Sequence, residues 1–136
     1  MARKSNPEQV TGLQLEILQT LWERKEASVG EVHEALSGNG RKMAYTTAMT
    51  LCKRMADRGL LTYVQRDRAY IYSPAVKRDS VLKRLLGGIV DRAFGGSEAE
   101  LALALLADAK IDPDELAELQ NLLADKERKL RRRRRR

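Results

Sequence analysis

The sequence has few of the residues from which covalent cross-links and metal centres are built. Cys52 is the only cysteine and His33 the only histidine among 136 residues. An internal disulfide is therefore excluded, and there is no pair of metal-binding cysteines. No run of eighteen apolar residues occurs, and no apolar core follows the basic start MARKSNPEQV, so neither a transmembrane helix nor a signal peptide is predicted. We expect a cytoplasmic protein with no metal and no cofactor.

Arrangements typical of catalysis are also missing. No nucleophile and base pair is recognisable, and there is no cluster of metal ligands. The Gly-Asn-Gly segment at 38–40 is interpreted as a turn rather than a phosphate-binding loop, because no strand precedes it. Cys52 is expected to pack in a core and His33 to be a surface or capping side chain. An enzyme is not predicted.

Positive charge is concentrated at one end of the chain. The net charge is +7, but residues 126–136 hold nine Lys/Arg and one Glu, which leaves −1 for the rest. Residues 1–75 carry a net +3 and residues 76–125 a net −4. This asymmetry favours an anionic partner for the front segment. The arginine block is expected to stay disordered, because like charges repel.

Capping boxes mark four expected helix starts, at Thr11, Ser28, Ser97 and Asp112. The residues that follow them show apolar positions at helical spacing, and a further helix is expected over residues 77–94. Pro113 suits the first turn of the last helix, since the N–H that proline lacks would make no helix bond there. Trp22, at the end of the first helix, is expected to anchor the core.

A third helix is expected over about residues 46–58. Ala48, Leu51 and Met55 recur at helical spacing, and Gly59 is placed to end the helix. The outer face carries threonines, although threonine is a weak helix former. A threonine hydroxyl can bond a phosphate or a base edge, and its methyl group can contact thymine. The threonines therefore favour a role in binding DNA.

After this helix the apolar period changes from 3.6 to 2. LLTYVQ and AYIYSP are predicted strands, and the intervening RDR is predicted to form a hairpin turn. Three helices followed by a two-stranded ribbon are typical of a winged helix, which places its third helix in the major groove. The predicted fold is mainly α with a small β-wing: a winged helix-turn-helix over 1–76, a helical dimerisation domain over 77–125 and a basic tail over 126–136.

The predicted DNA-binding surface has two parts. In the third helix, Arg54 is long enough to reach a guanine edge or to clamp a phosphate. The wing adds arginines suited to the DNA backbone or the minor groove, and Arg41 and Lys42 before the helix suit phosphate contacts. The predicted residues are Arg41, Lys42, Tyr45, Thr46, Thr47, Met49, Thr50, Lys53, Arg54, Arg66 and Arg68.

The sequence resembles the penicillinase repressor family, typified by the β-lactamase and methicillin-resistance repressors. The resemblance rests on the segments VTGLQLEILQTLW, SVGEVHEAL, AYTTAMTLCKRMADRGLL and RDRAYIYSPAV. The third of these is the most specific. The resemblance implies a homodimeric transcriptional repressor that binds a palindromic double-stranded DNA operator through its winged helix and dimerises through its C-terminal helices.

Apolar stripes on the three C-terminal helices independently favour a dimer. Helices too short to close a core of their own gain by burying these stripes against a second copy. The alternative, which the sequence leaves open, is that they fold back on the winged helix of the same chain. The predicted interface residues are Leu82, Leu85, Leu86, Ile89, Leu101, Leu105, Leu116, Leu119, Leu122 and Leu123.

Two signal-sensing features of the family are absent. Some members are inactivated by proteolysis at an Asn-Phe bond, whereas the corresponding segment here is ELALALLADAK, with Ala104–Leu105 at the aligned position. Cleavage of this segment by a protease with a different sequence preference stays open, so an inactivating protease stays a candidate partner. Copper-sensing relatives carry paired Cys-x-Cys motifs, which this tail lacks, so copper sensing of that kind is excluded. The inducing signal is not predicted.

Two other functions stay open from the sequence. A winged helix can also dock a protein, which would make the chain an adaptor. The arginine tail could instead drive DNA binding without sequence preference. Salt dependence separates the first alternative from DNA binding, because a protein that neutralises several phosphates loses affinity steeply as salt rises.

Overall fold

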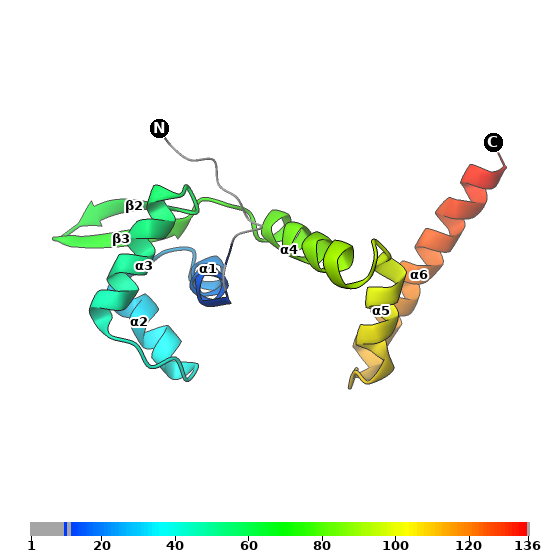
Figure 1. Ribbon diagram of the computed structural model, residues 1–136, viewed down its shortest axis with the longest axis horizontal. Helices are drawn as coiled ribbons and strands as arrows, with labels where there is room; N and C mark the ends of the chain where they lie inside the picture. Colours follow the sequence, from blue (N-terminus) through cyan, green and yellow to red (C-terminus); the bar gives the residue numbers. More distant parts are fainter. Residues whose placement is uncertain (1–9, 11, 136) are drawn as a thin grey trace. The chain divides into compact units, whose positions relative to one another are not determined.

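The structure is a computed structural model and describes residues 10 and 12–135. The chain divides into two compact units, Met1–Gly96 and Ser97–Arg136 (Figure 1). The sequence placed a boundary after residue 76, whereas helix α4 (Arg78–Ala93) belongs to the first unit. The assignment of DNA binding to 1–76 and of dimerisation to 77–125 stays a prediction.

The first unit contains the three helices expected for its front part: α1 (Gly12–Arg24), α2 (Val29–Gly38) and α3 (Tyr45–Asp57). The predicted capping box of α2 is complete. Ser28 Oγ accepts from the Glu31 N–H at 3.2 Å, and a Glu31 carboxylate oxygen accepts from the Ser28 N–H at 3.1 Å. These bonds, the one from the Ser28 backbone first, hold the pKa of Glu31 below its usual value. Thr11, the expected cap of α1, lies outside the described residues.

The wing is an antiparallel hairpin of β2 (Leu61–Arg66) and β3 (Ala69–Pro74), as predicted. Arg66 lies opposite Ala69, and the turn residues Asp67 and Arg68 have φ of 48° and 69°. Two successive positive φ values characterise the tight turns that match strand twist. A third strand, β1 (Ala27–Ser28), pairs with β3. The sequence did not predict β1, because two residues show no periodicity.

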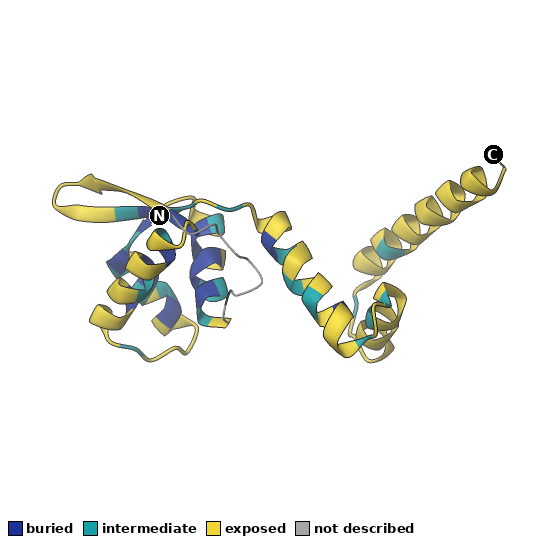
Figure 2. Ribbon diagram, turned by 45° about the horizontal axis from the view of Figure 1, so that its top comes forward, coloured by how far each residue is buried: buried dark blue, intermediate teal, exposed yellow. Residues whose placement is uncertain are grey.

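The core of the first unit lies between these three helices and the base of the wing (Figure 2). Burial of one such aliphatic side chain stabilises the fold by about 1.5–3 kcal/mol. Trp22 packs against this core, and its indole N–H donates to the Val76 carbonyl at 3.0 Å, which confirms it as an anchor. The fully buried large side chains of this core are Ile17, Leu18, Leu21, Val32, Leu36, Cys52 and Met55.

The thiol of Cys52 makes stability depend on pH. Cys52 packs in the core, as expected, but it is fully rather than partly buried, and burial raises the pKa of its thiol from about 9 to about 11. The folded chain therefore keeps this proton at a pH where the unfolded chain has lost it. The contribution of the protonated thiol is full below about pH 9 and is lost as pH rises to about 11.

We expect the free energy of unfolding of the native chain to fall more steeply between pH 9 and 11 than that of a Cys52→Ala variant. Urea denaturation at a series of pH values measures both. The comparison with Cys52→Ala removes the contributions of tyrosines and lysines that titrate in the same range. Parallel pH profiles for the two proteins would show that Cys52 does not titrate differently in the folded chain.

The second unit consists of α5 (Glu98–Ala107) and α6 (Pro113–Arg134). Both begin at their predicted caps. The Ser97 hydroxyl accepts from the Glu100 N–H at 3.1 Å, and an Asp112 carboxylate oxygen accepts from the Glu115 N–H at 2.9 Å. Neither α5 nor α6 has a residue that is buried within the single chain, as the yellow and teal ribbons of Figure 2 show.

The basic tail is helical rather than disordered, contrary to the expectation from charge repulsion. Helix α6 continues through the arginines to Arg134. Arginine and lysine are good helix formers, and cations are stabilised at the C-terminal end of a helix. Arg128 pairs with Asp125, and Arg131 pairs with Glu127 at 3.3 Å. Among the described helices, none combines the length and apolar content needed to cross a membrane.

Candidate nucleic-acid interface

Helix α3 is amphipathic, and its buried side fixes which residues face solvent. Ala48, Cys52 and Met55 are buried in the core. Leu51, expected on this face, is only half-buried, and Cys52 takes the central position. Every residue predicted to bind DNA is exposed, those of α3, the preceding loop and the wing alike. Exposure is what contact with a large ligand requires.

The N-terminal end of α3 is open to a ligand. Its N-cap residue, Ala44, makes no side-chain capping bond. His33 fixes the approach to the helix: its Nε2 donates to the Met43 carbonyl at 2.8 Å, and its ring lies edge-on to Tyr45 at 6.0 Å between centroids. The sequence predicts a surface or capping side chain for His33, whereas in the structure His33 is half-buried and donates to a loop carbonyl rather than to a helix end. Uncapped amides at a helix N-terminus form a natural seat for a phosphate.

The α3 threonines differ in what they can donate. The Thr50 hydroxyl donates to the Thr46 carbonyl at 2.9 Å, so that only its oxygen lone pairs and its methyl group face a ligand. Thr50 is thereby suited to accept from a base amino group or to contact a thymine methyl. Thr46 and Thr47 make no such side-chain bond within the described part of the chain, so their hydroxyls keep a free donor.

Two of the predicted cations are already engaged within the chain. Arg41 Nε donates to Glu16 at 2.7 Å, and Arg66 donates to both carboxylate oxygens of Glu26, at 2.8 and 3.4 Å. The hydrogen bond to Glu26 raises the pKa of Arg66. Exposed ion pairs of this kind contribute little to stability because water screens them, so a phosphate can compete for both arginines. Sequence patterns gave no signal of either pairing, because the partners are 25 and 40 residues apart.

The other predicted cations are available. Within the described ranges, Lys42, Lys53, Arg54 and Arg68 form no ion pair with a carboxylate. Arg68 occupies the wing turn itself. No group of three or more His, Cys, Asp or Glu side chains in the described chain is placed to hold a metal ion. The available chemistry of this surface is that of hydroxyls and free cations.

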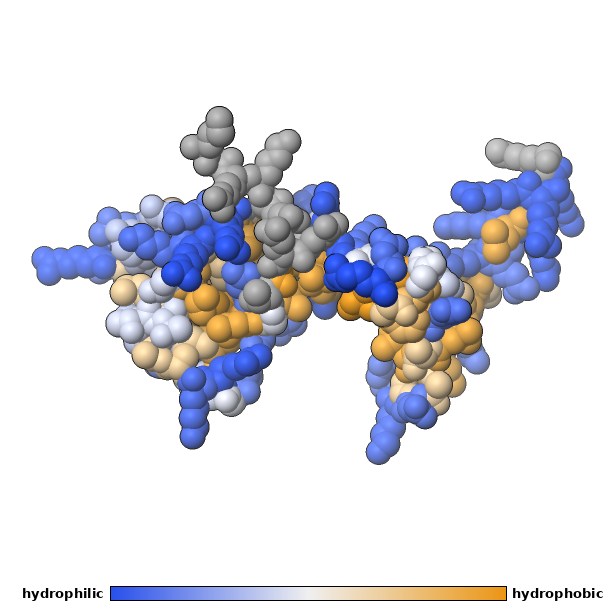
Figure 3. Space-filling model, viewed as in Figure 1, coloured by the Kyte–Doolittle hydropathy of each residue, from blue (hydrophilic) through white to orange (hydrophobic). Residues whose placement is uncertain are grey.

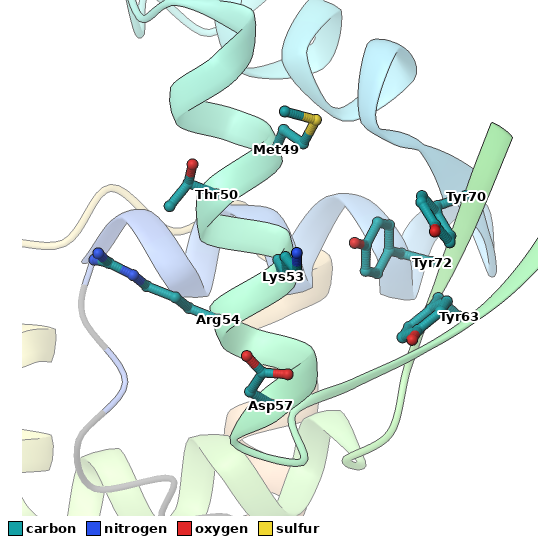
Figure 4. A pocket seen from close by; sticks show the side chains of 8 residues that line it. All are labelled: Met49, Thr50, Lys53, Arg54, Asp57, Tyr63, Tyr70 and Tyr72. Carbon is teal, nitrogen blue, oxygen red and sulfur yellow. The ribbon is translucent and has the colours of Figure 1, made fainter.

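A cleft of about 490 Å³ separates α3 from the wing, and we call it the wing cleft (Figure 4). One wall comes from α3 and the other from the tyrosines of β2 and β3. Figure 4 shows Arg54 pointing away from the tyrosines and Lys53 lying on their side of the helix. The cleft is lined by Met49, Thr50, Lys53, Arg54, Asp57, Tyr63, Tyr70 and Tyr72.

The tyrosines of the wing cleft were not among the predicted site residues. Tyr63 lies opposite Tyr72, and Tyr70 is two residues before Tyr72, so all three share one face of the hairpin. The Tyr63 ring lies 5.2 Å from that of Tyr70 and 5.7 Å from that of Tyr72, between centroids. The alternation of side chains along a strand predicts that Tyr70 and Tyr72 share a face. It does not predict that Tyr63 lies beside them, because that depends on the register of the hairpin.

Comparison with known proteins agrees with this geometry. The family model described as penicillinase repressor matches residues 10–125. The transcriptional regulator BlaI of Mycobacterium tuberculosis is 34% identical over 116 residues, which cover 85% of this chain and 83% of that protein. The penicillinase repressor of Staphylococcus aureus is 20% identical over 110 residues, 81% of this chain and 86% of that protein.

A solved structure of an Escherichia coli MarR mutant shares the fold with a TM-score of 0.52, at 16% identity over 88% of this chain and 79% of that one. The fold predicted from the sequence, mainly helical with a small antiparallel wing, is confirmed. The predicted family is confirmed as well. The chain belongs to the penicillinase repressor family of transcriptional regulators.

Proposed function

We propose that this chain is a transcriptional repressor that binds a palindromic double-stranded DNA operator as a homodimer. The observation that carries the proposal is the two-sided character of α3. Thr46, Thr47 and Arg54 are exposed on one side of the helix, and its other side packs into the core. The names of the relatives, a transcriptional regulator and a penicillinase repressor, support the same function. A dimer on the operator represses by blocking polymerase, which needs no catalysis and no cofactor.

Exposed leucines support the homodimer. None of the predicted interface residues is buried in the single chain. Leu105 of α5 is 62% exposed and Leu123 of α6 is 61% exposed, and Figure 3 shows apolar surface in orange over the second unit. Large apolar patches on a protein surface usually mark a site of association. A second copy offers the same leucines for an interface in which each chain covers the other.

Weakening of the dimer is enough to release the DNA. Each chain then holds the operator only through its own half of the contacts. The segment aligned with the family's cleavage site lies in α5, where Leu105 follows Ala104. A protease that accepts this sequence stays a candidate partner, and the inducing signal stays open. The cytoplasm stays the predicted compartment.

The test is binding of the full chain to the DNA upstream of its own gene and to a scrambled duplex, by fluorescence anisotropy across a salt series. We expect a preference for the native duplex and a linear fall of log K with log salt, with a slope of about −0.9 for each phosphate neutralised. Absence of DNA binding at every salt concentration would favour the protein adaptor instead.

The arginines of α6 need their own control. Because α6 runs through Arg134, deletion of residues 126–136 would shorten a helix that carries predicted interface residues. Replacement of Arg131, Arg132, Arg133 and Arg134 by glutamine keeps a good helix former and removes the charge. We expect this variant to bind both duplexes more weakly but to keep its preference. Loss of all binding would show that the arginines, rather than α3, supply the affinity.

A further inference from the structure

The hydroxyl of Tyr72 is an unused donor in the wing cleft. Tyr72 is only 4% exposed, yet its hydroxyl makes no hydrogen bond to any of the residues that the structure describes. No fully enclosed polar side-chain atom in the described chain lacks a partner, so this hydroxyl is reached from the cleft. A largely buried tyrosine normally finds a partner for its O–H. Because the hydroxyl faces the cleft, its acceptor comes from there, as water in the free chain or as a bound ligand that replaces that water.

The surroundings of this hydroxyl favour an anionic ligand. In Figure 4, Tyr72 directs its hydroxyl toward α3 at the level of Lys53, whose ammonium group has no carboxylate partner in the described chain. Burial raises the pKa of Tyr72, so its hydroxyl keeps its proton and acts as a donor. A neutral O–H and a free ammonium group facing one cleft together suit an oxyanion.

We propose that the wing cleft holds a phosphodiester group of one DNA strand, with the Tyr72 hydroxyl donating to a phosphate oxygen and the Lys53 ammonium pairing with it. This inference rests on the proposed function, because a strand enters the cleft only when α3 lies on DNA. Met49 and Thr50, predicted to contact DNA, line the same cleft. A strand that leaves the face of α3 would therefore pass between the helix and the wing.

A phosphate bound in the wing cleft would be a contact that does not depend on the DNA sequence. A phosphate looks the same in every nucleotide, so Tyr72 and Lys53 would fix the position of the protein without reading bases. Asp57 opposes the same ligand, since its carboxylate lines the cleft one helical turn beyond Lys53. Its negative charge should lower the affinity of the cleft for any duplex.

The test compares variants of the full chain on the native upstream duplex and on a scrambled duplex across a salt series. Tyr72→Phe keeps the ring and removes the hydroxyl; it should weaken binding to both duplexes by the same factor, about tenfold. Its salt slope should be unchanged, because the hydroxyl carries no charge. Lys53→Met should also weaken both, with a salt slope smaller by about 0.9. Asp57→Asn should strengthen both by a common factor.

Thr62→Val is the matched control, because it removes a hydroxyl from the opposite face of the wing, and it should bind like the native chain. The inference is overturned if Tyr72→Phe binds like the native chain, or if it weakens only the native duplex. Thermal melting of each variant establishes that it is folded. Asp57→Asn tests phosphate binding in the wing cleft without changing the tyrosines. The proposed function fails separately: in that case the native chain shows no preference for the native duplex.

Discussion

A Leu123→Glu variant should be monomeric at concentrations where the native chain is a dimer, and it should bind the full operator about 10²–10⁴-fold more weakly. Leu123 is 61% exposed in the single chain, so the fold of the chain loses little when it is replaced. In the proposed interface, however, the new carboxylate would have to leave water without a partner, which is strongly unfavourable. Sedimentation equilibrium measures the assembly, and fluorescence anisotropy measures the affinity.

The loss of operator affinity follows from the two half-sites. In a dimer the second winged helix binds at a high effective concentration, because the first has already bound. A monomer loses this gain but keeps its own contacts, so its affinity for an isolated half-site should equal that of the native chain. The half-site measurement therefore separates loss of dimerisation from loss of folding.

Asn121→Glu introduces the same charge on the other side of α6, two residues from Leu123 and so about 200° away around the helix. This control should stay dimeric and bind the operator normally. If Leu123→Glu stays dimeric as well, α6 is not part of the interface. If it is monomeric and still binds the operator at full strength, operator binding does not need the dimer.

An Arg54→Ala variant should lose sequence preference more than affinity for DNA in general. A guanidinium bound to a guanine edge contributes about 1–3 kcal/mol of discrimination against other bases. Arg54 can make such a contact because it is exposed on α3, points away from the wing tyrosines and has no carboxylate partner in the described chain. The measurement is the ratio of affinities for the native and scrambled duplexes at fixed salt.

Lys42→Ala is the comparison for Arg54→Ala. Lys42 lies in the loop before α3 and is expected to contact a phosphate, so its loss should lower both affinities equally and leave the ratio unchanged. The two variants thus separate base contact from backbone contact. If both lower the two affinities by a common factor, Arg54 binds the backbone and the preference comes from other residues of α3.

The helices and the wing are predictable from the sequence, because their signals are local. The Ser28 capping box, the apolar spacing around Ala48 and the change of period after Gly59 each lie within one element. Burial then follows from which side of the element is apolar. This is why the exposure of the predicted α3 residues could be anticipated before any contact was known.

The tail adopts a different structure from the one that its charge pattern predicts. Repulsion among the arginines predicted disorder, but the same residues extend a helix that has already begun at Pro113. Extending an existing helix avoids the unfavourable nucleation step. The leucines before the arginines had identified the helix; its length depended on the balance between propensity and repulsion, which composition alone does not give.

The packing of the chain, by contrast, determines which side chains of the DNA-binding surface are free and which are engaged. In the sequence, nothing distinguishes Arg41 from Lys42 or Arg66 from Arg68. In the structure, Glu16 pairs with Arg41 and Glu26 pairs with Arg66. The wing cleft depends on hairpin register, which places Tyr63 opposite Tyr72, and on the packing of α3 beside the wing. Local patterns fix which face of an element a residue occupies, whereas contacts between distant residues exist only once hydrophobic burial has brought the elements together.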